Sequence, residues 1–346
     1  MKRVSLLFVA SLVACGGGKS KQQNLAPLPE PPAEAKAEPK PEPAPEPPKQ
    51  LPPLEVKVEL PAVTVKLVNG GKGKKAALKY TAKAGTKQAV EVVMSFAQTA
   101  SVDGQSDSQV VPTIVLTGEA ETKAVDANGR AEYTFAVAST DARDVQGAAV
   151  PVDKFKTALA SLAGLVISGA VDPNGVSTET TMRIEKPDPL STGALDLVKV
   201  TLPGWPVLPK EPVGVGAKWQ TTANTVLRAA PGDKGIEMTH VTTYELVSRK
   251  GTTSTIKSKT TVSGKDQEYN GGKISKINGT GTSQITLEDG VLYPTAKSAI
   301  ETNLTASEKE KSMQLAFKIG GEINTKAAGT SAPAPTPAPA TPAPKQ

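Results

Sequence analysis

Apolar and polar residues alternate along most of the chain from Leu54 onward. Between Leu54 and Leu60, Leu and Val alternate with Glu and Lys, and after Pro61 the same pattern resumes from Val63 to Leu67. A period of two residues in a segment rich in β-branched side chains is typical of a strand with one buried face. The sequence therefore predicts that folded β-structure begins at Leu54.

Further strands follow the same pattern. They are expected at about 74–82, 87–99, 110–124, 131–139, 165–171 and 181–184 in the first half, and at about 217–228, 236–249, 252–263, 273–287, 291–305 and 311–325 in the second. Short turns separate them, such as Asp126-Ala127-Asn128-Gly129 and Glu288-Asp289-Gly290. Consecutive strands joined by short turns favour antiparallel pairing. The predicted fold is mainly β, with antiparallel sheets in two similar β-units that are open or half-barrel-like.

One helix is expected among the strands, at about 152–164. Phe155, Leu159 and Leu162 are spaced to form a single apolar stripe along it. Asp153 near its start and Gly164 near its end are typical of capping and stopping residues.

Composition divides the chain into six segments. They are 1–14, a signal peptide; 15–53, a lipidated cysteine and a disordered linker of Pro, Glu, Lys and Ala; 54–200, a first β-unit with the helix; 201–212, a proline-rich connector; 213–326, a second β-unit; and 327–346, a disordered Ala/Pro tail. The linker cannot bury enough apolar surface to offset the entropy of ordering it, and its prolines favour an extended chain. Strand, acidic Gly turn and return strand recur at 167–184 and 277–305, which suggests an internal duplication.

The connector has a proline at every third position: Pro203, Pro206, Pro209 and Pro212. In a polyproline II conformation these four prolines share one face, with Trp205 beside them. One interpretation is a docking ligand for a proline-recognising partner. The other is a stiff connector packed between the two β-units, with Trp205 as its hydrophobic pin. The few charges nearby favour the second interpretation.

Charge and cysteine content narrow the possible partners. Without residues 1–14, 38 basic residues face 34 acidic ones. This excess is mild, and no basic stripe interleaved with aromatic residues occurs, so we expect no nucleic-acid partner. Cys15 is the only cysteine, which leaves no intramolecular disulfide to stabilise the fold.

Patterns typical of catalysis or metal binding do not occur. His240 is the only histidine, and the chain contains no Gly-x-Ser-x-Gly elbow. One His and one Cys are too few ligands for a zinc site. Gly214-Val215-Gly216 lacks the helix and downstream acid of a dinucleotide site. We therefore expect no enzymatic activity, no cofactor and no metal.

Two pairs of Asp or Asn residues are better explained by local backbone structure than by metal binding or catalysis. Asp126 and Asn128 offer oxygen ligands for calcium, but no bidentate Glu follows at the required distance, so turn formation is the better account. Asp141 and Asp144 would serve acid–base chemistry only if they faced a cleft. A solvated loop is the default interpretation for this second pair.

The first fifteen residues carry the most specific chemistry in the chain. Lys2 and Arg3 precede an apolar run, which is the pattern of a secretory signal peptide. Leu12-Val13-Ala14-Cys15 resembles the lipobox of bacterial lipoproteins. The resemblance implies cleavage between Ala14 and Cys15, a diacylglyceryl thioether on Cys15 and acylation of the freed amine. Several acyl chains hold a protein stably at a membrane, whereas a single chain is marginal. Gly16 is not the aspartate that resembles an inner-membrane retention signal, so an outer-membrane anchor in the bacterial envelope is expected.

A second resemblance involves the segment from Pro212 to Trp219. Pro-Val-Gly-Val-Gly-Ala-Lys-Trp is similar to a Pro-Val-x-Val-Gly-x-x-Trp segment in an uncharacterised family of bacterial β-rich lipoproteins, over roughly residues 75–325. More distantly, the strand-hairpin units resemble the half-barrels of periplasmic lipoprotein carriers. In those carriers a curved antiparallel sheet wraps a helix and leaves an apolar cavity. This chain departs from them by its few aromatic residues, and the resemblance assigns no ligand-binding residues.

These observations define two alternative functions. The first is a non-catalytic, membrane-anchored envelope lipoprotein that acts as a scaffold or as an interaction module for other envelope proteins. The alternative is a carrier or sensor of an apolar ligand such as a lipid, bound on a curved antiparallel sheet. A filled core favours the scaffold, and a cavity favours the carrier.

Overall fold

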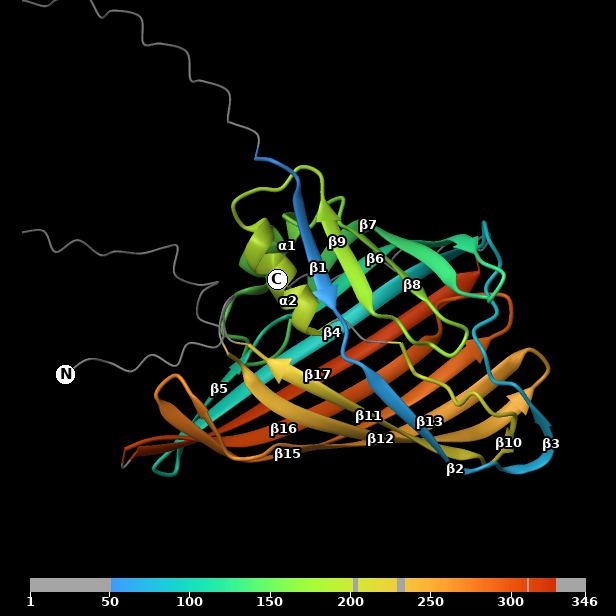
Figure 1. The fold of residues 1–346 in the computed structure, drawn as a ribbon. Coiled ribbons are helices and arrows are strands. Elements are labelled where there is room, and N and C mark those ends of the chain that lie inside the picture. The colour runs from blue at the N-terminus through green and yellow to red at the C-terminus, as the bar shows by residue number, and fades with distance from the viewer. Residues whose placement is uncertain (1–50, 202–204, 229–233, 310, 328–346) are drawn as a thin grey trace, which may run out of the picture.

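The computed structural model describes residues 51–201, 205–228, 234–309 and 311–327 (Figure 1). Within these ranges the chain forms seventeen strands and two helices. The prediction of a mainly β, antiparallel fold is confirmed. The predicted signal peptide and nearly all of the predicted linker and tail lie outside the described residues. Neither described helix is long and apolar enough to cross a membrane.

Fifteen strands form one open antiparallel sheet. Across the sheet the order is β1 (Leu54–Glu59), β9 (Glu179–Ile184), β8 (Val166–Val171), β7 (Ala131–Arg143), β6 (Thr113–Val125), β4 (Lys87–Val102), β17 (Lys311–Ala327), β16 (Thr295–Glu308), β15 (Gly272–Glu288), β13 (Thr253–Ser263), β12 (Ile236–Lys250), β11 (Lys218–Leu227) and β2 (Val63–Asn69). Off this path, β5 (Gln105–Val110) pairs with β4 and β14 (Gln267–Tyr269) pairs with β15. A separate two-stranded sheet joins β3 (Lys72–Ala76) to β10 (Val213–Val215).

The two predicted β-units meet at three strand pairs, of which β4 with β17 is the longest; β2 also pairs with β11, and β3 with β10. The pairing of β4 with β17 runs without interruption from Val102 opposite Met313 to Gln88 opposite Ala327. The two units therefore share one continuous sheet. In each unit, consecutive strands are mostly neighbours, and this order is common to simple antiparallel arrangements. The internal duplication consequently stays a prediction.

The first two strands of the chain lie at opposite edges of the sheet. Only residues 60–62 connect β1 to β2. Such a link spans at most about 14 Å, because an extended chain advances up to about 3.6 Å per residue. The two edges must therefore approach each other, and the sheet curls into a trough (Figure 1).

The core fills the concave side of this trough in two clusters. In the larger cluster, inward side chains such as Leu116, Phe135 and Met182 pack with the helices. The smaller cluster centres on Trp219 and Leu246, both fully buried. Burial of these apolar side chains is the dominant force that holds the curled sheet together.

The predicted helix is present as α1 (Val152–Ala160), which buries Phe155 and Leu159. Residues 161–164 form a turn instead of a last helical turn. The capping role predicted for Asp153 is wrong. Pro151 occupies the N-cap position, and no side chain forms a capping hydrogen bond at this end of the helix. Gly164 ends the turn with a φ of 74°.

A second helix, α2 (Ser191–Thr201), lies where the sequence predicts none. Asp188 caps it: its Oδ1 accepts hydrogen bonds from the backbone N–H of Leu190 at 2.8 Å and of Ser191 at 3.0 Å. In return, Ser191 Oγ accepts from the N–H of Asp188 at 2.8 Å. This reciprocal cap satisfies donors that the first turn would leave unpaired. Leu195 and Val198 of α2 are buried in the larger cluster.

The predicted strand at 74–82 is wrong over most of its length. β3 ends at Ala76, and residues 77–86 form no strand. Leu78 and Tyr80 are nevertheless both buried, at 4% and 6% exposure. The apolar residues alternate here because this segment packs Leu78 and Tyr80 against the smaller cluster. No neighbouring strand in the described ranges pairs with the segment, so it is not a strand.

Candidate functional site

An apolar cavity of about 90 Å³ lies inside the trough. Seven helices and strands contribute to its wall, together with three segments that connect elements. The lining residues are Val58, Leu60, Val92, Tyr133, Phe135, Ile167, Thr180, Met182, Lys199, Trp205, Tyr293, Pro294 and Ile323. The cavity is thus built from β1, β4, β7, β8 and β9 of the first β-unit, from β17, and from α2 and the connector.

Aromatic rings form one side of this cavity. Trp205 packs edge-to-face against Tyr80, Tyr133 and Tyr293, with ring centroids 5.6, 5.3 and 4.9 Å apart. Tyr293 also lies edge-to-face with Tyr133 at 5.8 Å. Such arrangements place the positive edge of one ring against the negative face of another. The prediction that Trp205 pins the connector is borne out by these contacts.

One glutamine positions Tyr293. The Gln88 side chain is 4% exposed. Its Oε1 accepts hydrogen bonds from the backbone N–H of Leu292 at 3.1 Å and of Tyr293 at 2.9 Å, and its Nε2 donates to the Tyr293 carbonyl at 3.0 Å. The start of β4 therefore fixes the segment before β16, which carries Tyr293 into the cavity wall.

The turn between β8 and β9 holds the part of the connector that follows Trp205. The Asn174 carbonyl accepts from the N–H of Leu208 at 2.8 Å, and Asn174 Nδ2 donates to the Pro209 carbonyl at 3.2 Å. Tyr80 Oη donates to the Pro206 carbonyl at 3.0 Å. The connector downstream of Trp205 is thereby bonded to the sheet through its backbone.

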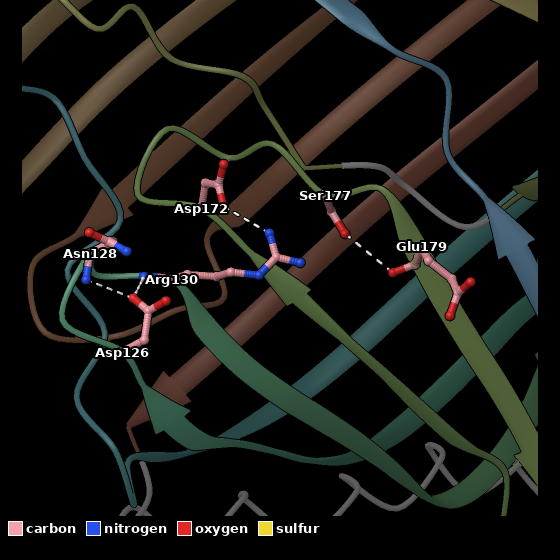
Figure 2. Close-up of polar contacts among 6 residues, drawn as sticks. All are labelled: Asp126, Asn128, Arg130, Asp172, Ser177 and Glu179. Atoms are coloured by element: carbon pink, nitrogen blue, oxygen red, sulfur yellow. Dashed lines mark hydrogen bonds and ion pairs between the residues drawn. The ribbon is translucent and has the colours of Figure 1, made fainter.

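A polar network stabilises that turn from outside, as Figure 2 shows. Asp126 Oδ1 accepts hydrogen bonds from the N–H of Asn128 at 2.8 Å and of Arg130 at 2.9 Å. Arg130 Nη1 in turn donates to Asp172 Oδ1 at 2.9 Å. The turn interpretation of Asp126 is therefore confirmed, and its carboxylate organises the β6–β7 hairpin beside the β8–β9 turn.

Few polar groups reach the cavity. Tyr133 Oη accepts a hydrogen bond from Trp205 Nε1 at 3.4 Å and lies 3.4 Å from Thr180 Oγ1. Among the described residues, Lys199 is the only charged residue of the lining, and its Nζ lies 2.7 Å from Asp196 Oδ1. Burial raises the pKa of Tyr293 well above its ordinary value, and the nearby Tyr133 adds to this effect. Tyr293 is therefore a neutral phenol near pH 7.

Other residues considered in the sequence lie apart from the cavity. Asp141 pairs with Lys156 at 2.9 Å, which lowers the pKa of Asp141, while Asp144 accepts from the backbone N–H of Val145. These two aspartates form no joint site. His240 lies on β12 and does not line the cavity.

The predicted lipidation site and the segment from Pro212 to Trp219 are not among the described residues that line the cavity. Ala14 and Cys15 lie outside the described residues. In the segment that ends at Trp219, Gly214 lies against the backbone of Lys72, where an added Cβ would come within 2.2 Å of its carbonyl oxygen. Trp219 Nε1 donates to the Val207 carbonyl at 2.9 Å. This segment therefore joins the small sheet to the connector.

No local pattern in the sequence marks Tyr133, Phe135 and Tyr293 as cavity residues. Their signal is their rarity: the chain has only twelve aromatic residues, and four of them line this one cavity. Within the described part of the chain, no three His, Cys, Asp or Glu side chains gather as a metal site would require.

Comparisons with protein-family models and with curated proteins gave no match. The arrangement of this chain's own residues is therefore the basis for a functional proposal.

Proposed function

We propose that this protein is a lipid-anchored protein of the bacterial envelope that binds an apolar ligand inside its curled sheet. The observation that carries the proposal is the cavity, whose lining is apolar and aromatic and whose one cation is paired with an aspartate. Ligand sites typically combine an apolar lining with a few polar groups. The proposal involves no catalytic step.

The size of the cavity limits what it holds. A single water needs about 10–15 Å³, and sites for drug-sized ligands enclose about 300–1,000 Å³. A cavity of about 90 Å³ therefore suits the end of an acyl chain or a small ring. We propose that the apolar end of a longer ligand occupies it, while the remainder extends along the trough.

A matched pair of variants on β1 tests this proposal. Val58 lines the cavity, whereas Val56 faces the same side of the strand and does not line it. In the full chain carrying Cys15→Ala, we expect Val58→Phe to weaken binding of the fluorescent apolar probe N-phenylnaphthylamine by about tenfold, because the larger ring fills the cavity. Val56→Phe should bind the probe like the parent.

The outcome of that titration decides between the alternatives. Equal probe binding by both variants, or no binding by the parent, would contradict the proposal. Cys15→Ala is used so that acyl groups attached to the protein itself do not compete for the cavity.

The anchor is proposed from the residues that end at Cys15. The lipobox-like sequence predicts acylation, and acyl chains would retain the protein at the membrane. Growth with an alkyne-labelled fatty acid should label the wild type and leave Cys15→Ala unlabelled and released from the membrane fraction. Equal labelling of both proteins would refute the anchor and leave the cavity proposal intact.

A second candidate function, a protein-interaction module, is favoured by the two sheet edges. Within the described ranges, β1 pairs only with β9 and β2 only with β11, so each strand has one side without a described partner strand. Val65 and Val68 of β2 are 39% and 59% exposed. Free edges can accept an added strand from another protein. This function would be favoured if β2 crosslinked to another envelope protein in cells. It would be favoured further if the purified protein carried no apolar ligand in its cavity.

A further inference from the structure

The middle of the concave face differs from its two ends. Along β12, Ile236 and Leu246 are buried, whereas the inward residues between them, including His240 and Thr242, are only partly buried. On β15, Ser283 is likewise partly exposed although it faces inward beside the buried Ile285. Between its two packed ends the trough therefore has a middle region in which several inward side chains are only partly buried, although Thr221 and Ser258 are buried there.

Hydroxyl side chains line this middle region. Strand register places them in two adjacent rows that cross the second β-unit, and we call them the hydroxyl band. Its members are Thr221, Thr242 and Thr260 in one row, and Ser258, Ser283 and Ser298 in the other. Hydroxyl side chains at inward positions contribute little apolar surface, so packing of the core does not account for them.

Four of the six hydroxyls form two pairs, and Ser298 Oγ donates to the Gly321 carbonyl at 3.3 Å. Thr242 Oγ1 lies 2.9 Å from Thr260 Oγ1, and Ser258 Oγ lies 2.7 Å from Ser283 Oγ. Within such a pair one hydroxyl donates and the other accepts, so the acceptor retains its own hydrogen. The band can thus donate and accept hydrogen bonds at several points.

The inward face around the band carries no formal charge. No Asp, Glu, Lys or Arg faces inward within 219–227, 236–246, 254–262, 277–287, 296–306 or 313–325. Charged residues of these strands lie on the convex side instead, where Lys218 pairs with Glu245 and Lys318 with Glu301. A charged group brought into the trough would lose hydration without meeting an opposite charge on these strands.

Two buried polar atoms beside the band have no hydrogen-bond partner among the described residues. They are His240 Nε2 and Thr225 Oγ1. Ala223 pairs with His240 and Met238 with Thr225, so the two residues are diagonal neighbours on the inward face. An unpaired buried polar group costs roughly 1–3 kcal/mol. Both atoms are enclosed, so a ligand hydroxyl would recover part of that cost only after a neighbouring side chain shifts.

The band also adjoins the cavity. Ser298 pairs with Gly321, and Ile323, which lines the cavity, is two residues further along β17. Two residues of a strand advance about 7 Å. A ligand whose apolar end occupies the cavity can therefore place its polar end on the band.

From this geometry we propose that the ligand is a neutral glycolipid, with its uncharged, hydroxyl-rich headgroup on the hydroxyl band. The proposal rests on the apolar cavity as the binding site of the hydrocarbon chain. It names the polar part of the same ligand and excludes phosphate, sulfate and quaternary ammonium headgroups.

Three amphiphiles with the same hydrocarbon chain test the headgroup. Octyl glucoside, octyl sulfate and octyltrimethylammonium would each be titrated, below micelle formation, against N-phenylnaphthylamine bound to the full chain carrying Cys15→Ala. We expect octyl glucoside to displace the probe at a concentration about tenfold lower than either charged amphiphile, which corresponds to about 1.4 kcal/mol. Equal displacement by all three would overturn the headgroup inference and leave the cavity standing. Failure of all three to displace the probe would count against the proposed function itself.

A matched pair of aspartate substitutions on β15 locates the effect. Ser283→Asp places a charge on the band, whereas Thr282→Asp places one on the exposed convex face of the same strand. Ser283→Asp should abolish the preference for octyl glucoside, and Thr282→Asp should retain it. A preference that survives Ser283→Asp would place the headgroup elsewhere, and probe binding by both variants confirms that they are folded.

Discussion

At the scale of single residues, isolated side chains hold together segments that are distant in sequence. Gln88 bonds three backbone groups of Leu292 and Tyr293, and Trp219 reaches the connector at Val207. Because both side chains are buried, their hydrogen bonds are costly to break. His240 is the opposite case, since its buried Nε2 has no partner in the described part of the chain.

His240 should make the stability of the protein fall in mild acid. Burial lowers its pKa below the ordinary value of 6.5, so the folded state binds the proton less tightly than the unfolded state. The stability that the neutral imidazole contributes is fully present above pH 6.5. It is lost as the pH falls through the lower pKa of the folded state. The neighbouring inward residues add no carboxylate that would offset this effect. Between about pH 7.5 and 5, urea unfolding should show a smaller loss of stability in His240→Gln than in the wild type. Parallel pH curves would contradict this expectation.

At the scale of elements, the β8–β9 turn determines where the connector lies. Gly175 has a φ of 83°, and an added Cβ would lie 2.2 Å from the Pro206 carbonyl oxygen and 2.8 Å from the Tyr80 ring. The turn therefore combines a left-handed backbone with close approach of two other segments. Displacement of this turn would move the backbone that follows Trp205.

A comparison of two glycines separates backbone strain from packing at this turn. Gly164 has a similar φ of 74°, but an added Cβ there meets nothing within 4 Å. We expect Gly164→Ala to cost about 1 kcal/mol through strain alone, and Gly175→Ala to cost about 2–4 kcal/mol because it also displaces the connector. Urea unfolding of both variants measures the difference. Equal losses would mean that the connector moves aside freely.

The sequence predicts the elements of this fold better than their arrangement. Alternation locates long strands such as β12 and β17 within a few residues, because each has one buried face. It fails at Leu78 and Tyr80, where alternate burial occurs without strand pairing. It also misses α2, which begins at Ser191 and is capped by Asp188.

The cavity could not be predicted from local patterns, because its wall depends on strand order. Val58, Val92 and Ile323 come from three elements that only the pairing of β1, β4 and β17 within one curled sheet brings together. The scarcity of aromatic residues in the sequence argues against a cavity large enough for a whole lipid. Four aromatic residues instead gather at one place and define a small cavity.

At the scale of the whole molecule, the sheet depends on its last strand. β17 pairs with β16 on one side and with β4 on the other, and it contributes Leu315, Phe317 and Ile323 to the larger cluster. It is therefore both a joint between the two β-units and part of the core. The predicted Ala/Pro tail that follows it has no apolar periodicity.

Two truncations should have very different effects. A chain that ends after Glu308 lacks β17 and should lose its cooperative thermal transition, because β4 and β16 lose their shared partner. A chain that ends after Ala327 lacks only the predicted tail and should melt within about 2 °C of the full chain, since it retains the core. Circular dichroism on heating measures both. A cooperative transition without β17 would show that the two β-units fold separately.

The pairing of β4 with β17 also sets the order of events when the chain folds. Phe96 pairs with Ile319, a separation of about 220 residues, so closing this contact carries a large entropic cost and is expected to be slow. During synthesis β4 is made early and must wait until nearly the whole chain has followed. Val92 and Ile323, on these same two strands, then meet to complete the cavity wall. Binding of an apolar ligand would therefore report that β17 has been synthesised and has paired with β4.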